Sequence, residues 1–323
     1  VKTKKKGPAS QALGADALRL WVASSDFTRD VFIGQSVLDS NHSTLLKFRM
    51  ILKMLLGSMH PTSANSPVTT LDKIALHHLE VVMSEVDAFY NNFEFYQGVK
   101  SIIKWVNTDL SSFYLEAMKD RLYCGDGGGV LDIIFNGFLK MLCPITPMLI
   151  EEAWSYRPEW LIARGDPHPF HRTPCQPIIN NLRSKPDSTL ISDIPWLMNA
   201  ASAIKIAQEQ ARKQKLMGSS LGCSVILQLP CSATTTFSRY STDLDDIFVV
   251  SLVEFGETPE AIWKFSTSFD VPGGKGTAWI LPPKDQKCPR CWRYVATATG
   301  ELCKRCDEVI RTLPDNIVDN TMI

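Results

Sequence analysis

Apolar residues recur at three- and four-residue steps over the first half of the chain, from residue 14 to residue 154. This spacing places apolar side chains on one face of an α-helix. The segments "STLLKFRMILKMLLGSM" and "DKIALHHLEVVMSEVDAFYNNF" predict amphipathic helices, with Gly57 as the expected stop of the first. "GVKSIIKWVNTDLSSFYLEAMKDRLYC" and "VLDIIFNGFLKMLCPITPMLIEEAW" continue the pattern. The sequence therefore predicts a helical bundle over residues 16–156, preceded by a connector at residues 1–15.

The pattern changes after residue 156, where prolines stand at positions 158, 167, 169, 174, 177, 186 and 195. Because proline interrupts helices and strands, this composition predicts a linker over residues 157–199. Helical spacing then returns up to Gly218, and "CSVILQLP", "DIFVVSLVEF" and "GTAWILPP" predict short strands. We expect a small α/β module at residues 200–283, a cysteine-rich unit at residues 284–311 and a tail without clear signal at residues 312–323.

Composition and charge narrow the class of protein. The 323-residue chain is 45% hydrophobic and carries 34 basic and 34 acidic residues, so its net charge is +0. An anionic partner such as RNA would therefore have to meet local basic patches. No run of eighteen apolar residues occurs, and "VKTKKKGPAS" lacks the apolar core of a secretion signal. We expect a soluble protein without a membrane partner, and nine cysteines without paired spacing along most of the chain favour a reducing compartment.

Four cysteines lie near the end of the chain, in "CPRCWRYVATATGELCKRC" at residues 288–306. Cys288 and Cys291 form one Cys-x-x-Cys pair, and Cys303 and Cys306 form a second. Two such turns complete a tetrahedral thiolate shell suited to Zn²⁺ and leave no position for a reacting water, so the predicted site is structural. Two disulfides or four unliganded thiols are the alternatives. Zinc is favoured because about 25 residues cannot build a sufficient core of their own.

Basic and aromatic side chains surround these cysteines. Arginine and lysine neutralise phosphates, and an aromatic ring can stack on an unpaired base. The terminal unit therefore predicts a site for single-stranded RNA, formed by Arg290, Trp292, Arg293, Tyr294, Lys304 and Arg305. The alternative is that Trp292 only covers the metal site and the charges only solvate a surface.

Common catalytic motifs are missing from the sequence. It contains no Walker-type phosphate loop, no dinucleotide-binding glycine motif, no His-Glu-x-x-His pair and no nucleophile elbow. The acidic residues of "DLDD" at residues 243–246 are expected on a solvent face or at a helix start. By itself, the chain has the features of a binding module rather than an enzyme.

Several longer segments resemble the C-terminal part of one family, the isoleucyl-tRNA synthetases of the bacterial and organellar type. "TDLSSFYLEAMKDRLY" is similar to the family's most recognisable helical motif, and "LLKFRMILKMLLGSM" to its first anticodon-domain helix, with Arg49, Met50 and Ile51 in place of the usual Arg-Asn-Thr. "GADALRLWVASSDFTRDVFIG", "CPITPMLIEEAW" and "EQARKQKLMGSSL" also resemble family segments. The helical motifs alone leave the valyl and leucyl enzymes open, and the four-cysteine unit points to the isoleucyl enzymes.

This resemblance implies a mainly α fold. It consists of a class I synthetase anticodon-binding helical bundle, a small α/β module and a C-terminal four-cysteine zinc ribbon. The parent enzyme would join isoleucine to its tRNA with ATP and Mg²⁺. Its nucleotide-binding motifs and editing domain would lie upstream of Val1, so we expect this chain to be a non-catalytic fragment. The implied partners are tRNA-Ile and the upstream remainder of the synthetase, in a monomer of the mitochondrial matrix or, alternatively, the bacterial cytoplasm.

The resemblance also extends the set of candidate RNA contacts. Basic positions of the family's helical motifs are matched by Arg49, Lys53, Lys119 and Arg121. The later helix carries four more basic residues, Lys205, Arg212, Lys213 and Lys215. An exposed lysine is often only solvated, and Lys119 and Arg121 could instead form structural ion pairs. Two other functions stay open: a DNA-binding zinc unit like the finger of bacterial base-excision glycosylases, and a protein-interaction scaffold capped by zinc.

Overall fold

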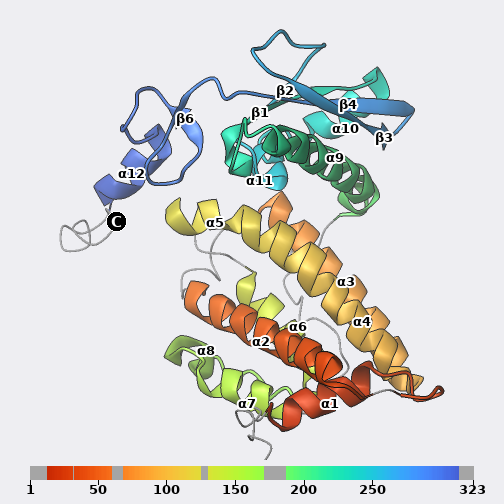
Figure 1. Cartoon of the computed structure of the whole chain (residues 1–323). Helices are drawn as coiled ribbons and strands as arrows, with labels where there is room; N and C mark the ends of the chain where they lie inside the picture. Colours follow the sequence, from red (N-terminus) through yellow and green to blue (C-terminus); the bar gives the residue numbers. More distant parts are fainter. Residues whose placement is uncertain (1–12, 32, 60–67, 125–129, 171–186, 313–323) are drawn as a thin grey trace, which may run out of the picture. The chain divides into compact units, whose positions relative to one another are not determined.

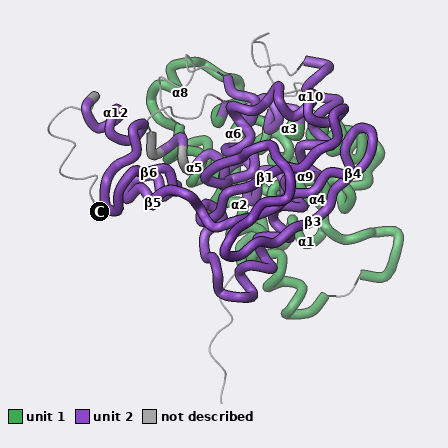
Figure 2. Tube along the Cα trace, turned by 90° about the horizontal axis from the view of Figure 1, so that it is seen from above, with its two compact units in different colours: residues 1–61, 78–107, 131–178 green, residues 62–77, 108–130, 179–323 purple. Residues whose placement is uncertain are grey.

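The structure is a computed structural model, and it describes residues 13–31, 33–59, 68–124, 130–170 and 187–312. The chain forms two compact units, each assembled from separate stretches of sequence (Figure 2). Unit 1 comprises residues 1–61, 78–107 and 131–178, and unit 2 comprises residues 62–77, 108–130 and 179–323. Most of the predicted connector, residues 171–186 of the predicted linker and nearly all of the tail lie outside the described residues. The predicted domain boundaries stay a prediction.

Unit 1 is helical throughout its regular described segments, as the apolar spacing predicts (Figure 1). Each long helix buries an apolar stripe, and the buried side chains form one core. Its helices are α1 (Ala15–Ser24), α2 (Gln35–Ser58), the later part of α3 (Thr70–Asn91), α4 (Phe95–Trp105), α6 (Leu131–Leu142), α7 (Pro147–Ser155) and α8 (Glu159–Ala163).

Phe138 on α6 lies at the centre of this core. Its ring meets the rings of Phe48 and Trp105 at centroid distances of 5.5 and 5.6 Å, both edge to face. At the neighbouring Gly137, a Cβ atom would come within 3.0 Å of the side chain of Leu79. Glycine therefore lets α6 approach α3 closely at this level of the core.

A buried carboxylate joins the first and later helices of unit 1. Asp16 on α1 is only 5% exposed, and its Oδ2 accepts a hydrogen bond of 2.8 Å from the backbone N–H of Leu149 in the first turn of α7. Arg19 pairs with the other carboxylate oxygen at 2.8 Å. The carboxylate thus satisfies one of the N–H groups that a helix start leaves without a partner within the helix.

Two helical predictions need correction. Gly57 does not stop the first long helix, because α2 includes Gly57 and ends at Ser58. The pattern expected to be one continuous helix consists of α4, a π-helix η2 (Val106–Tyr114) and α5 (Leu115–Cys124). The π-helix has a wider turn than the α-helix, and apolar spacing over nine residues does not separate the two.

Unit 2 contains a four-stranded sheet with helices on one face (Figure 1). The strand order is β2-β1-β4-β3, with β1 and β2 parallel and the other pairs antiparallel. Val225, Leu227, Ala278 and Ile280 alternate with less buried residues, and their face packs against the long helix α9. The elements are α9 (Ser188–Lys213), η3 (Ser220–Gly222), β1 (Ser224–Gln228), α10 (Cys231–Ser238), α11 (Leu244–Phe248), β2 (Leu252–Phe255), β3 (Phe265–Val271) and β4 (Gly274–Leu281).

The α/β module and the predicted linker differ from the prediction at three places. The expected strand "DIFVVSLVEF" is divided between α11 and β2, and β3 was missed because its "FSTSFDV" sequence combines serine and threonine with few apolar residues. The predicted linker contains α8, and α9 begins inside it at Ser188. Asp187 starts α9 as an N-cap that accepts from Leu190 N at 2.6 Å, and Pro195 lies within the helix.

The cysteine-rich segment has little regular structure. It contains a short antiparallel pair, β5 (Gln286–Lys287) and β6 (Tyr294–Ala296), and the helix α12 (Lys304–Thr312). Within the described residues, none of the helices has the length and apolar character needed to cross a membrane.

Candidate metal centre and nucleic-acid interface

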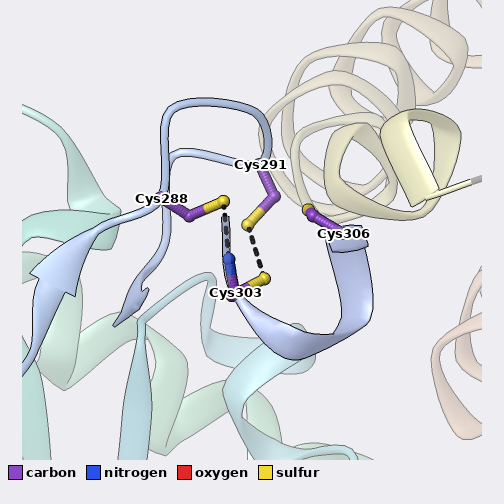
Figure 3. A group of neighbouring side chains, drawn as sticks. All are labelled: Cys288, Cys291, Cys303 and Cys306. Atoms are coloured by element: carbon purple, nitrogen blue, oxygen red, sulfur yellow. Dashed lines mark hydrogen bonds between the residues drawn. The ribbon is translucent and has the colours of Figure 1, made fainter. Parts of the chain in front are cut away.

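The four predicted metal ligands converge on one point (Figure 3). Their Sγ atoms all lie within 4.8 Å of one another, and all four cysteines are buried. None of them is in a disulfide, and the Sγ atoms of Cys291 and Cys303 are 3.8 Å apart. Zn–S bonds of about 2.3 Å in a tetrahedron place sulfur atoms about 3.8 Å apart. The buried four-cysteine cluster therefore has the dimensions of a structural zinc site.

Short backbone hydrogen bonds shape the turn that carries the first pair. The backbone N–H of Cys288 donates to Arg293 O at 2.8 Å, and the N–H of Trp292 donates to Cys288 O at 3.0 Å. Cys303 N lies 3.4 Å from Cys288 Sγ and joins the two pairs, and Cys306 follows in the first turn of α12. The residues between the two cysteine pairs thus form a loop that brings the second pair next to the first.

The thiols of this cluster differ in acidity. Burial tends to raise the pKa of Cys288, but N–H groups of Cys303, Cys291 and Arg290 stabilise the thiolate and lower the pKa to about 7. Burial raises the pKa of Cys291 to about 12, and the charges of neighbouring Cys303 and Cys288 add to this effect. A divalent cation among the sulfurs would instead lower the pKa of Cys291, because the cation stabilises every thiolate that it binds.

Trp292 directly follows the second cysteine and points outward from the metal-binding turn. Its side chain is 56% exposed, and its φ of 65° lies in the left-handed region that favours glycine. The ammonium group of Lys287 lies 5.3 Å from the centroid of the indole ring, within the range of a cation–π contact. A bulky residue is thus held in an unfavourable backbone conformation with its aromatic face beside a cation.

The neighbouring Arg293 has the opposite environment. It is only 5% exposed, and its guanidinium group forms ion pairs with Asp245, at 2.8 Å, and with Asp246, both on α11. The acidic segment "DLDD" lies at the start of α11, one of the two places that the sequence predicted, and its Asp245 and Asp246 pair with Arg293 there. Arg293 connects the metal-binding turn to the α/β module, and we do not retain it as a candidate RNA contact because carboxylates already occupy its guanidinium group.

The other predicted residues of the terminal unit lie at or near its surface. Lys304 is exposed, whereas Arg290, Tyr294 and Arg305 are half-buried. Tyr294 N donates to Ser251 Oγ at 2.8 Å, which gives the terminal unit a second attachment to the module. Four thiolates and one Zn²⁺ would carry a net charge of −2, so cationic side chains beside the cluster are also electrostatically favourable.

Arg121 is the second candidate RNA contact that the structure buries. It is 8% exposed, and its Nη1 lies 2.9 Å from both carboxylate oxygens of the fully buried Asp72. Tyr114 donates to the same carboxylate at 2.7 Å. Burial tends to lower the pKa of Arg121, but Asp72 outweighs this effect and the pKa is raised. Arg121 therefore has a structural role within unit 2, one of the alternatives that the sequence left open.

The other basic residues on the helices keep partly or fully exposed side chains. Arg49 pairs with Glu152 at 2.8 Å, and Lys119 pairs with Glu116 at 2.5 Å. Lys205 donates to Ser112 O at 3.1 Å, and Arg212 donates to Gly218 O at 2.8 Å. Lys53 and Lys213 are exposed and form no ion pair with a described residue. Lys215, also exposed, lies just beyond the end of α9.

Comparison with known proteins gives the family. The family described as the anticodon-binding domain of tRNA ligase matches residues 72–227. The chain contains an anticodon-binding domain of this family. Over its length the chain is similar to the C-terminal third of isoleucine–tRNA ligases, as the sequence motifs predicted.

Three relatives illustrate the extent of this similarity. The mitochondrial isoleucine–tRNA ligase of Schizosaccharomyces pombe is 30% identical over 321 residues, which cover 93% of this chain and 33% of that protein. The isoleucine–tRNA ligases of Kosmotoga olearia and Gloeobacter violaceus are 32% and 31% identical, over 92% and 91% of this chain. The chain thus spans about a third of the length of these relatives.

The anticodon-binding domain match covers only some of the candidate residues. Lys119, Lys205, Lys213 and the buried Arg121 lie within residues 72–227, whereas the four cysteines and Trp292 lie beyond them. Sequence reasoning missed two groups, Lys287 beside Trp292 and the pair Asp245 and Asp246 that holds Arg293. The spacing of Lys287, five residues before Trp292, offered no signal, since only the fold of the turn brings them together.

Proposed function

We propose that this chain binds the anticodon arm of tRNA-Ile as the C-terminal part of an isoleucine–tRNA ligase. In this proposal the helical bundle holds the anticodon stem and the later modules contact the loop. Such binding positions the tRNA for a distant catalytic site. We infer that ligation of isoleucine with ATP and Mg²⁺ belongs to the two thirds of such a ligase that this chain does not span, and that the chain itself is non-catalytic.

We infer that Cys288, Cys291, Cys303 and Cys306 hold a structural Zn²⁺ ion. The size and burial of the cluster support this inference. Bound there, the ion would cross-link the two Cys-x-x-Cys turns. Four protein ligands fill a tetrahedral shell, so the site has no position at which a water could be activated.

The observation that carries the RNA-binding proposal at the terminal unit is the conformation of Trp292. An exposed tryptophan in left-handed backbone costs about 1–2 kcal/mol relative to an unstrained residue, and such a conformation motivates the proposal of a function for the exposed indole. Stacking on an unpaired base provides one, and Lys287 beside the ring supplies a charge for the adjoining phosphate. We propose the following contact set: Trp292, Lys287, Arg290, Lys304 and Arg305, with Lys53 and Lys213 as phosphate contacts.

The test is a filter-binding assay of the zinc-loaded chain against a panel of transcribed tRNAs at several salt concentrations. We expect preference for tRNA-Ile and a steep loss of affinity with rising salt, because each neutralised phosphate releases counterions. Trp292→Ala should weaken tRNA-Ile binding about 5- to 150-fold, the equivalent of one stacked base at about 1–3 kcal/mol. Phe93→Ala serves as the matched control, since Phe93 is also exposed and in left-handed backbone, on another element.

Four results would contradict this proposal or part of it. Equal affinity for all tRNAs would remove the specificity for tRNA-Ile, and a preference for duplex DNA would favour a DNA-binding zinc unit. Absence of salt-dependent RNA binding would favour a protein-interaction scaffold. Unchanged affinity after Trp292→Ala would remove Trp292 from the contact set.

We further propose that the ligase is a monomer of the mitochondrial matrix. The similarity to the mitochondrial protein of S. pombe supports this location, and the similarly related bacterial proteins make the bacterial cytoplasm the alternative. Fractionation of the source cells followed by immunodetection tests the location, and sedimentation equilibrium tests the oligomeric state.

A further inference from the structure

A cleft of about 350 Å³ lies within unit 2, and its described lining contains none of the four cysteines. The turn that follows α9, the end of β4 and the start of the terminal unit form its walls, which include Lys215, Gly222, Trp263, Pro282, Pro283 and Tyr294. Its volume falls at the lower end of the range of small-ligand sites, about 300–1,000 Å³. The cleft is therefore large enough for a single small planar group rather than an extended ligand.

The backbone at Lys215 is unusual for a lysine. Lys215 N donates to Arg212 O at 2.9 Å and Leu216 N donates to Ala211 O at 3.1 Å, the pair of bonds of a Schellman helix end. The residue at this position adopts left-handed backbone and is usually glycine, yet Lys215 occupies it with φ of 58°. A lysine in strained left-handed backbone thus places its exposed ammonium group at the cleft.

The turn beyond Lys215 is held in place by its own hydrogen bonds. Arg212 donates to Gly218 O and to Ser220 Oγ, each at 2.8 Å. Ser219 Oγ accepts from Leu221 N at 3.3 Å. Arg212, predicted as an RNA contact, therefore fixes this wall of the cleft from within the protein.

Two aromatic residues, Trp263 and Tyr294, also line the cleft. Trp263 lies near the end of the connection between β2 and β3 and contacts Phe265 at a ring distance of 6.1 Å. Tyr294 is anchored through its backbone N–H to Ser251, and its ring lies 3.8 Å from the position that a Cβ of Gly222 would take. Both rings are half-buried, so each is fixed by the protein on one side and accessible from the cleft. Among the described lining residues, Lys215 is the charged one.

We propose that this cleft receives one unpaired nucleobase of the bound RNA, with the adjoining phosphate at Lys215. Flat aromatic and proline surfaces suit the faces of a base, and a single cation without an acidic neighbour in the lining suits the RNA backbone rather than a peptide of mixed charge. This inference rests on the proposed function. It adds a second base site, built on the α/β module and separate from Trp292.

The experiment measures binding of the zinc-loaded chain to transcribed tRNA-Ile and to a series of the same RNA in which one anticodon-loop nucleotide at a time is abasic. Trp263→Ala should weaken binding of intact tRNA about 5- to 150-fold. Lys215→Asn should weaken it less, and asparagine tolerates the left-handed backbone. Ile262→Ala, next to Trp263 and 97% exposed, is the matched control and should leave affinity unchanged.

The abasic series tests the contact directly. One abasic position should weaken binding to the wild-type chain but not further weaken binding to Trp263→Ala, because the two changes remove the same stacking contact. Trp263→Phe, which keeps an aromatic wall, should retain most of the affinity and verify that the site folds. Circular dichroism and zinc content should match the wild type in each variant.

The outcomes separate this inference from the proposed function. If the wild-type chain binds no tRNA, the proposed function fails and this inference fails with it. If the wild type binds tRNA-Ile but Trp263→Ala binds equally well, only the cleft assignment is overturned. The assignment is likewise overturned if every abasic position adds its full effect to that of Trp263→Ala.

Discussion

Unit 1 and the terminal cysteine-rich segment represent two ways of holding a fold together. Unit 1 surrounds Phe138 with buried aromatic and aliphatic side chains from several helices. In the terminal segment, the buried cluster consists of the four cysteines and Ala296, with Leu302 packed against it. A few apolar atoms cannot offset the conformational entropy of about 25 ordered residues, at about 1.5 kcal/mol each. On this comparison, the proposed metal ion would stabilise the terminal unit as the apolar core stabilises unit 1.

The largest effect is expected from removing one metal ligand. Cys303→Ser should release zinc and unfold the terminal unit, since ligation contributes about 10–16 kcal/mol in small zinc units. Metal analysis and circular dichroism would measure the two effects, and the helical signal should change little. Loss of most helical signal in this variant would refute the separation between a metal-dependent unit and a core-dependent unit.

A core substitution in unit 1 should lower the stability of the helices and leave the zinc content unchanged. Phe138→Ala leaves a cavity beside Phe48 and Trp105 and should lower the free energy of unfolding by about 3–5 kcal/mol. Chemical denaturation followed by far-ultraviolet circular dichroism measures this loss. Zinc content should stay at one ion per chain in the folded variant, and a fall in zinc content would contradict the prediction.

The smallest effect concerns the backbone of the metal-binding turn. Because residue 292 adopts a φ of 65°, Trp292→Gly should be more stable than Trp292→Ala by about 1 kcal/mol. Competition for zinc with a chelator compares the two variants. Both should lose RNA affinity equally, since neither has the indole ring. Equal zinc retention would show that the left-handed conformation imposes no strain in the turn.

Arg121 and Arg293 show what reasoning from sequence could not decide. Both were candidate RNA contacts, and both are buried in ion pairs with aspartates far away along the chain. Basic residues on a helix or a metal-binding turn are usually exposed, so their type and position predict a surface role. Only the fold brings Asp72 to Arg121 and Asp245 to Arg293, across 49 and 48 residues respectively.

The sequence alone determined the helical bundle and the four cysteines that form the candidate metal site. Helical periodicity and Cys-x-x-Cys spacing are local patterns, so each can be recognised from a few neighbouring residues. The tertiary structure decided which basic residues stay accessible, that Trp292 faces outward while Arg293 faces inward, and that Lys215, Trp263 and Tyr294 share one cleft. These features depend on contacts between distant segments and on backbone angles, which residue spacing does not encode.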